Sequence, residues 1–246
     1  MLQNKTIGLV SGIGPLAGFD VLKKIYDYAA EKYGAHQDEE YPDVIMFNHG
    51  IGVDALANDS PAFHDGVVEM VKQLETWGAN IIGIACNTAH IYYNDLKPQR
   101  DTQVINLIDE VAKVAKKAAP NATFGLLSSR GTRDQKLYHN YLDRHGVAFT
   151  EANDQQQKLL DKTIDLVMAH REKQAARFLH QVIYEMAKTG VSRFILGCTE
   201  LPIAFDSISK NSRSKYENNL IDANRILASC LVDRYMEGGL IHEKTN

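Results

Sequence analysis

The sequence predicts an α/β fold of two similar lobes, each a parallel sheet flanked by helices. Short apolar runs alternate with amphipathic segments along the 246-residue chain, and the pattern of the first half recurs in the second half. Such alternation is typical of parallel sheets with helical crossovers. Open parallel sheets bind ligands at the carboxyl ends of their strands. We therefore expect internal duplication, with the active site in the cleft between the two lobes.

The first half supplies three expected strands in order. An apolar run at 6–10 ends at the glycine-rich segment 11–15, where glycines permit a tight turn and a proline suits a helix start. A second strand is expected at 44–47, and the run 81–84, after Gly78 has ended a helix, leads to Cys86. The two helices are predicted from apolar residues at helical spacing, namely Phe19, Leu22, Ile25, Tyr26 and Ala29, then Val67, Val68, Val71 and Leu74.

Three matches relate the second half to the first. Segment 6–11 is echoed by 123–128, 117 residues later, and Gly78 and Gly190 each precede a cysteine by eight residues, 112 residues apart. The tetrapeptide Asn-Leu-Ile-Asp at 106–109 recurs at 219–222, 113 residues later. A repeated order at a nearly constant offset indicates duplication. We expect the first lobe to comprise 1–104 plus 212–246, and the second lobe to comprise 105–211.

The composition is that of an ordinary globular protein and argues against several partners. With 27 Lys and Arg against 31 Asp and Glu, the formal charge is −4, and no basic run suits nucleic acid. No stretch approaches the roughly 18 apolar residues of a membrane span, so no membrane partner is expected and a cytoplasmic location is the default. The three cysteines form no disulfide framework and are expected as thiols.

Cys86 and Cys198 each follow an apolar run and precede small polar residues. Backbone N–H groups at such a turn can lower the pKa of a thiol from about 8.5 and can bind a carboxylate. One nucleophilic cysteine assisted by His90 is one interpretation. A metal centre is disfavoured, because the sequence has no Cys-x-x-Cys pair. The duplication favours two acid–base groups on opposite faces of one carbon, as a two-base racemase requires.

Four motifs resemble the signatures of the aspartate/glutamate racemase family and occur in the right order over nearly the whole chain. They are Ser11-Gly12-Ile13-Gly14-Pro15, Cys86-Asn87-Thr88-Ala89-His90, Ser129-Arg130-Gly131-Thr132 and Gly197-Cys198-Thr199-Glu200. Within that family the chain looks most similar to aspartate racemases and broad-specificity amino-acid racemases. Glutamate racemases usually carry a serine where this chain has His90.

The resemblance implies racemisation of a small-molecule amino acid without pyridoxal phosphate, another cofactor or a metal. Cys86 and Cys198 are the implied catalytic thiolate and thiol, one on each face of the α-carbon. The family also implies a homodimer. The implied substrate-binding residues are Asn87, Thr88, Thr132 and Thr199 for the α-carboxylate, Ser11 and Glu200 for the amino group or for tuning a thiol, and Gly12 and Asn48.

The side-chain specificity departs from the pattern of aspartate racemases. Relatives that act on aspartate tend to carry an arginine and a lysine where this chain has Ala55 and Gln157, with Lys158 as an alternative if the alignment shifts by one residue. Without those cations a substrate carboxylate is poorly paired, which favours a neutral or basic amino acid. Two other functions stay open: a non-catalytic amino-acid or carboxylate-binding protein of this fold, and a related one-cysteine isomerase or decarboxylase.

Structural roles are expected for several other polar residues. Cys230 lies within a helical apolar pattern and is interpreted as an inert packing group. A hydrogen-bonding role is favoured for His90 over a role as catalytic base. Asp109 and Asp222, which close the repeated tetrapeptide, are expected to cap helices. The glycine-rich segment 11–15 is interpreted either as part of the site or as a turn required by the strand-to-helix geometry.

Overall fold

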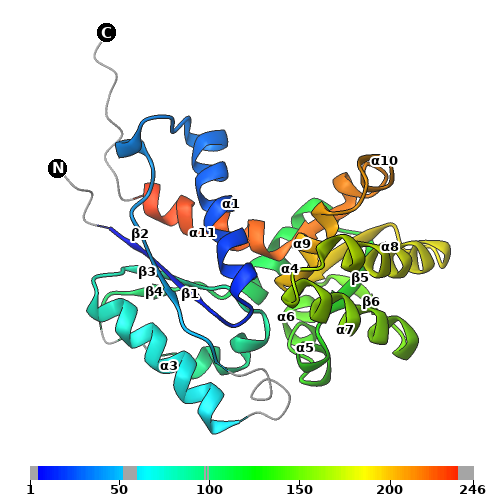
Figure 1. Ribbon diagram of the computed structural model, residues 1–246, viewed down its shortest axis with the longest axis horizontal. Helices are drawn as coiled ribbons and strands as arrows, with labels where there is room; N and C mark the ends of the chain where they lie inside the picture. The colour runs from blue at the N-terminus through cyan, green and yellow to red at the C-terminus, as the bar shows by residue number, and fades with distance from the viewer. Residues whose placement is uncertain (1–4, 52–59, 97, 99, 238–246) are drawn as a thin grey trace.

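The computed structural model describes residues 5–51, 60–96, 98 and 100–237, which form two parallel four-stranded sheets (Figure 1). The first sheet has the order β2-β1-β3-β4, made by Val44–Asn48, Ile7–Ser11, Ile81–Ile84 and Gln103–Val104. The second has the order β6-β5-β7-β8, made by Ala148–Glu151, Thr123–Ser128, Arg193–Gly197 and Leu220–Asp222. The equal strand order confirms the predicted α/β fold of two similar lobes.

Helices flank both sheets (Figure 1). Beside the first sheet lie α1 (Pro15–Tyr33), α3 (Pro61–Thr76) and α11 (Ala223–Met236). The helices between β4 and β8 are α4 (Leu107–Ala118), α5 (Arg130–Asp134), α6 (His139–Arg144), α7 (Asp154–Met168), α8 (Glu172–Lys188), α9 (Glu200–Asp206) and α10 (Lys210–Arg213). In the described part of the chain, 3₁₀ segments occupy Asp38–Glu40, Thr88–Asp95 and Glu217–Asn219. Within the described ranges, no helix has the length and apolarity to cross a membrane.

The alternation of side chains along β1 divides the first lobe into two buried layers. Ile7 and Leu9 belong to a cluster that includes residues of α1 and α11, whereas Val10 belongs to a cluster with residues of α3. This is the period of two that a strand covered on both faces requires. In α1 the buried positions include Val21 and Ile25, while Phe19 and Tyr26 are exposed, so part of the predicted helical face was wrong.

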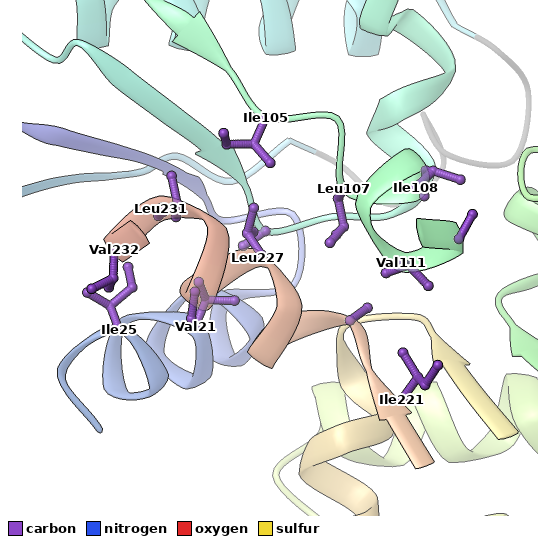
Figure 2. Close-up of a cluster of buried hydrophobic side chains, with 14 of the residues drawn as sticks. Val21, Ile25, Ile105, Leu107, Ile108, Val111, Ile221, Leu227, Leu231 and Val232 are labelled. Carbon is purple, nitrogen blue, oxygen red and sulfur yellow. The ribbon is translucent and has the colours of Figure 1, made fainter. Parts of the chain in front are cut away.

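One buried cluster is common to both lobes. Figure 2 shows Val21, Ile25, Leu227, Leu231 and Val232 of α1 and α11 on one side of it, and Leu107, Ile108, Val111 and Ile221 on the other. The same cluster continues into the second sheet through Phe124 of β5 and Ile195 of β7. The two lobes therefore share an apolar core and do not meet as separate surfaces.

The chain returns from the second lobe to the first later than predicted. β8 pairs in parallel with β7 and so belongs to the second sheet, although the sequence prediction placed 212–246 in the first lobe. The return comes at α11, which packs against α1 and β3. The prediction placed the boundary in the polar run near 210–215, but the structure forms the short helix α10 there and continues through the second sheet.

The register confirms two of the three sequence matches and corrects the third. Gly8 of β1 pairs with Ile82 of β3, and Gly125 of β5 pairs with Phe194 of β7, as the offsets of 117 and 112 require. The repeated Asn-Leu-Ile-Asp is not equivalent: 107–109 open α4, whereas 220–222 form β8. The matching residues are instead the N-caps Asn106 and Asp222, each accepting hydrogen bonds from backbone N–H groups of the helix that follows.

Candidate active site

A cavity of about 610 Å³ lies between the lobes, and both motif cysteines are on its wall. All four motifs contribute, through residues 12–15 and 86–88 from the first lobe and 129–131 and 198–200 from the second. Most of these residues follow the carboxyl ends of β1, β3, β5 and β7. The cleft between duplicated sheets that the sequence predicts is thus present and has the size of a small-molecule site.

Cys86 follows β3 and precedes the 3₁₀ segment Thr88–Asp95. Its side chain is buried, and burial raises the pKa of the thiol to about 12. Backbone hydrogen bonds from Ala89 and Thr88 act in the opposite direction, and the nearby Glu200 raises the pKa further. The prediction that backbone N–H groups lower the thiol pKa is wrong here, because desolvation outweighs them.

Cys198 follows the equivalent strand β7 and has a side-chain hydrogen-bond partner, which Cys86 lacks among the described residues. Its Sγ donates a hydrogen bond to Glu200 Oε2 at 3.0 Å, and Thr199 Oγ1 donates to the same oxygen at 3.2 Å. Burial raises the pKa of the Cys198 thiol well above its usual value, and the neighbouring carboxylate adds to this. Burial also raises the pKa of Glu200. The two thiols therefore differ in their environments although they lie at equivalent strand ends.

The glycine-rich loop after β1 lines the cavity and is shaped by two glycines. Gly12 and Gly14 have φ values of 94° and 81°, which lie in the left-handed region. A Cβ on Gly14 would lie 2.1 Å from Glu200 Oε1, and a Cβ on Gly12 would lie 2.2 Å from the backbone oxygen of His49. The loop is therefore both the turn required between β1 and α1 and a wall that holds the Glu200 carboxylate close.

Asn87 lies on the cavity wall with its amide orientation fixed. The hydroxyl of Tyr138 donates a hydrogen bond to Asn87 Oδ1 at 2.6 Å, and both side chains are buried. The amide nitrogen of Asn87 has no hydrogen-bond partner among the described residues. Tyr138 also lies against Gly197, where an added Cβ would be 2.9 Å from its ring. Sequence reasoning missed Tyr138, because a lone tyrosine just before α6 carries no local signal.

Three hydroxyl groups join the lobes beside the cavity. Thr88 Oγ1 from the first lobe lies 3.1 Å from Ser129 Oγ and 2.9 Å from Thr132 Oγ1, both from the second lobe. Ser129 Oγ in turn donates to Thr132 Oγ1 at 3.0 Å. Thr88 and Ser129 line the cavity, whereas Thr132 is not among the residues of its wall. Thr132 is buried behind them and supports the other two hydroxyls.

Thr199 is held in place by a polar group from α11. Its side chain donates to Glu200, and its backbone carbonyl accepts a hydrogen bond from Asn224 Nδ2 at 2.8 Å. Asn224 Nδ2 also donates to Asp20 of α1, 2.6 Å away, and Asp20 forms an ion pair with Lys24. The loop that carries Cys198 is thus tied to two helices of the first lobe.

Besides Thr132, two more predicted substrate-binding residues are not part of the cavity wall. Ser11 donates a hydrogen bond to Asn48 Oδ1 at 2.8 Å, and its hydroxyl packs against Gly18 of α1, where a Cβ would be 1.8 Å away. Neither Ser11 nor Asn48 is among the wall residues. Gln157 is likewise not among the wall residues, and its amide donates to the Ser128 carbonyl and to Asp161. Ala55 lies outside the described residues.

His90 and Cys230 have surroundings that match the structural interpretations. His90 Nδ1 lies 2.8 Å from the backbone oxygen of Cys86, and burial lowers the pKa of the imidazole, so the ring is held neutral. Cys230 packs beside the shared core on α11, away from the cavity. Neither side chain is placed to act on a molecule in the cavity.

A model of the Asp/Glu/Hydantoin racemase family matches residues 10–231. The chain belongs to this racemase family. Its place in the family confirms the resemblance inferred from the four motifs, and as a racemase it is an isomerase.

Individual relatives of the racemase agree with this assignment. The broad-specificity amino-acid racemase RacX of Bacillus subtilis (strain 168) is 26% identical over 234 residues, which are 94% of this chain and 98% of RacX. The structure of aspartate racemase from Picrophilus torridus matches with a TM-score of 0.80 and 25% identity over 94% of both chains. A glutamate racemase from Bacillus anthracis shares the fold, with a TM-score of 0.66 and 18% identity over 99% of this chain and 86% of that one.

Sequence reasoning also missed one wall of the racemase cavity. Asp161, Ile164, Asp165 and Met168 of α7 line it, together with Asp134 at the end of α5. Charged residues three and four positions apart on a helix usually form a solvated face, and the sequence does not show that this face closes a cavity.

Proposed function

We propose that this racemase inverts the α-carbon of an amino acid by a two-base mechanism that uses Cys86 and Cys198. The observation that supports this best is the placement of the two cysteines. They occupy equivalent strand ends of two duplicated sheets, both are buried, and both lie on the wall of one cavity of about 610 Å³. A protein that only binds an amino acid has no need for two such thiols.

The proposed reaction conserves protons within the site. The thiolate of one cysteine removes the α-proton, and the electron pair of the broken C–H bond is delocalised into the α-carboxylate. The thiol of the other cysteine then donates its proton to the opposite face of the same carbon. After inversion the first sulfur holds the proton and the second holds the negative charge. The reverse reaction starts from that second protonation state.

The negative charge that develops on the carboxylate needs fixed hydrogen-bond donors. The amide nitrogen of Asn87 is without a partner in the described part of the chain, while Tyr138 holds the other end of the amide. The hydroxyls of Thr88 and Ser129 line the same cavity. We assign the α-carboxylate to these groups, because they are oriented before the substrate arrives.

Glu200 is proposed to bind and release the proton of Cys198. The Sγ–Oε2 distance of 3.0 Å is that of a direct hydrogen bond, and burial raises the pKa of both groups. Transfer of the proton from sulfur to the carboxylate would produce a thiolate inside the cavity without loss of a proton to water. The ammonium group of a bound amino acid would stabilise that state by neutralising part of the negative charge.

The test is solvent deuterium exchange at the α-carbon, followed together with inversion, in wild type and in Cys86→Ser and Cys198→Ser. We expect inversion to fall at least about 100-fold in each variant, since each removes one of the two acid–base groups. Cys230→Ser is the matched control, because Cys230 lies away from the cavity, and it should keep wild-type rates. Full inversion in both single variants would refute the two-base mechanism. Binding of amino acids without any exchange would favour a non-catalytic binding protein.

A further inference from the structure

We propose that the substrate of this racemase carries a positive charge at the end of an aliphatic side chain, as lysine, ornithine and arginine do. This inference rests on the proposed function and names the substrate class of the same site. It follows from how charged and apolar groups are distributed around the cavity. One part of the wall carries a group that can bind a carboxylate, and another part carries carboxylates that can bind a cation.

The first observation concerns α7, whose cavity-facing residues alternate in character. Asp161, Ile164, Asp165 and Met168 all line the cavity. Their spacing of three, four and seven places them on one face of the helix. Ile164 and Met168 offer apolar surface to the stem of a side chain, and the aspartates offer charge to its end. The long side chains of basic amino acids have this same division into an apolar stem and a charged head.

The second observation is the charge balance of the described wall. The charged side chains of the wall are Arg130, Asp134, Asp161, Asp165 and Glu200. Arg130 is already engaged, because its Nη2 and Nε donate to Asp161 Oδ2 at 2.6 and 3.0 Å. Asp134 and Asp165 are exposed and accept no hydrogen bond from a cationic side chain elsewhere in the described structure. These two carboxylates give the wall a net negative charge in addition to that of Glu200.

The third observation is independent of the aspartates and fixes the other end of the ligand. Asn87 lies on the wall and is 2% exposed, and its amide nitrogen, which is itself buried, has no hydrogen-bond partner among the described residues. It calls for an acceptor such as the α-carboxylate. A ligand with a carboxylate at Asn87 and a cation near Asp134 and Asp165 matches both groups at once.

Other amino acids fit this wall less well. An acidic side chain would approach the two carboxylates, and the amide of Gln157 is engaged with Ser128 and Asp161. A neutral side chain would contact Ile164 and Met168 but would gain nothing from Asp134 and Asp165. L-Lysine and L-norleucine therefore form the informative pair, since they differ mainly in the terminal ammonium group.

The experiment compares kcat/KM for L-lysine, L-norleucine and L-glutamate in wild type and in the double variant Asp134→Asn/Asp165→Asn. We expect wild type to prefer lysine to norleucine by at least about tenfold at low salt. The double variant should lose most of that preference, because its kcat/KM for lysine falls towards its own kcat/KM for norleucine. Each carboxylate is exposed, so its effect should be modest and should weaken as salt is added. Asp143→Asn, in the exposed part of α6, is the matched charge control and should leave the preference unchanged.

The outcomes separate this inference from the proposed function. Inversion of norleucine and lysine at equal rates, or a preference for glutamate, would overturn the basic substrate class while leaving the two-base racemase intact. Retention of the lysine preference in the double variant would show that Asp134 and Asp165 do not select the substrate. Failure of every amino acid to exchange its α-proton would instead refute the proposed function.

Discussion

The hydroxyl of Tyr138 donates a hydrogen bond of 2.6 Å to the side-chain oxygen of Asn87, across the junction of the two lobes. The contact determines which end of the amide faces the tyrosine, because only the oxygen can accept this hydrogen bond. The amide nitrogen is then left for another acceptor. Tyr138, which lies outside the four sequence motifs, thus orients Asn87, which belongs to one of them.

Tyr138→Phe should therefore impair the site without removing a group that touches the substrate. We expect KM for the amino acid to rise about threefold to tenfold, because the amide of Asn87 is no longer held in one orientation. The unpartnered oxygen should also cost roughly 1–3 kcal/mol in free energy of unfolding. Steady-state kinetics and urea unfolding measure the two effects.

Tyr141→Phe is the matched control for this substitution. Tyr141 also bonds to an asparagine side chain, accepting from Asn106 Nδ2 at 2.9 Å, but this pair lies outside the cavity wall. The control should lower stability and leave KM unchanged. An equal change of KM in both variants would contradict the positioning role of Tyr138.

Glu200→Gln should slow inversion more than it weakens binding. The amide cannot accept the proton of Cys198, so kcat should fall by about 100-fold, the usual contribution of one general base. KM should change less. Glu69→Gln on the exposed face of α3 removes the same charge far from the thiols and should have no effect. A kcat of the Glu200 variant within threefold of wild type would show that Cys198 ionises without the carboxylate.

The pH dependence of kcat/KM should report the raised pKa values of the buried thiols. A thiol must lose its proton to act as base, and burial raises the pKa of Cys86 to about 12 and that of Cys198 well above its usual value. In Glu200→Gln this proton can be lost only to water, so we expect kcat/KM of that variant to rise by up to about tenfold per pH unit from pH ~7 to ~9. In wild type Glu200 takes up the proton of Cys198 within the site, so kcat/KM should change much less over the same range. An equally steep rise in wild type would show that Glu200 does not accept the proton.

Gly14→Ala should displace the Glu200 carboxylate. The new Cβ would lie 2.1 Å from Glu200 Oε1, at a residue whose φ is 81°. We expect a loss of roughly 1–2 kcal/mol from the backbone conformation alone, together with a fall in kcat. Gly34→Ala separates the two effects, because Gly34 has a φ of 73° and nothing within 4 Å of an added Cβ. The control should lose stability and keep its kcat, and a parallel loss of kcat in both variants would contradict the steric argument.

Much of the fold could be predicted because the sequence repeats its own strands. Gly8 and Gly125 occupy equivalent register positions, and the strands that deliver Cys86 and Cys198 do so as well. The Asn-Leu-Ile-Asp repeat predicted an equivalence that the structure does not have, because a Leu-Ile pair can be buried at the start of a helix or in a short strand. The structure shows that the cap position, filled by Asn106 or Asp222, is the real equivalence.

The candidate site was predictable where a motif follows a strand directly. Residues 86–88 and 198–200 lie on the cavity wall as the positions of their strands indicate. The direction in which a side chain points is harder to predict, and Ser11 and Asn48 bond to each other and are not among the wall residues. Contributions from distant helices, such as Tyr138 and the α7 aspartates, depend on tertiary packing that no local pattern encodes.

The packing of α11 against α1 and β3 has a consequence for how the chain folds as it is synthesised. Leu227 and Leu231 of this helix are fully buried in the same cluster as Ile7 and Leu9 of β1, although more than 200 residues separate them along the chain. During translation β1 and α1 emerge long before α11, so the part of this apolar surface that α11 covers stays open while the second lobe is made. The first lobe can complete its core only after the second lobe has been synthesised, which makes completion of the core a late step in biosynthesis.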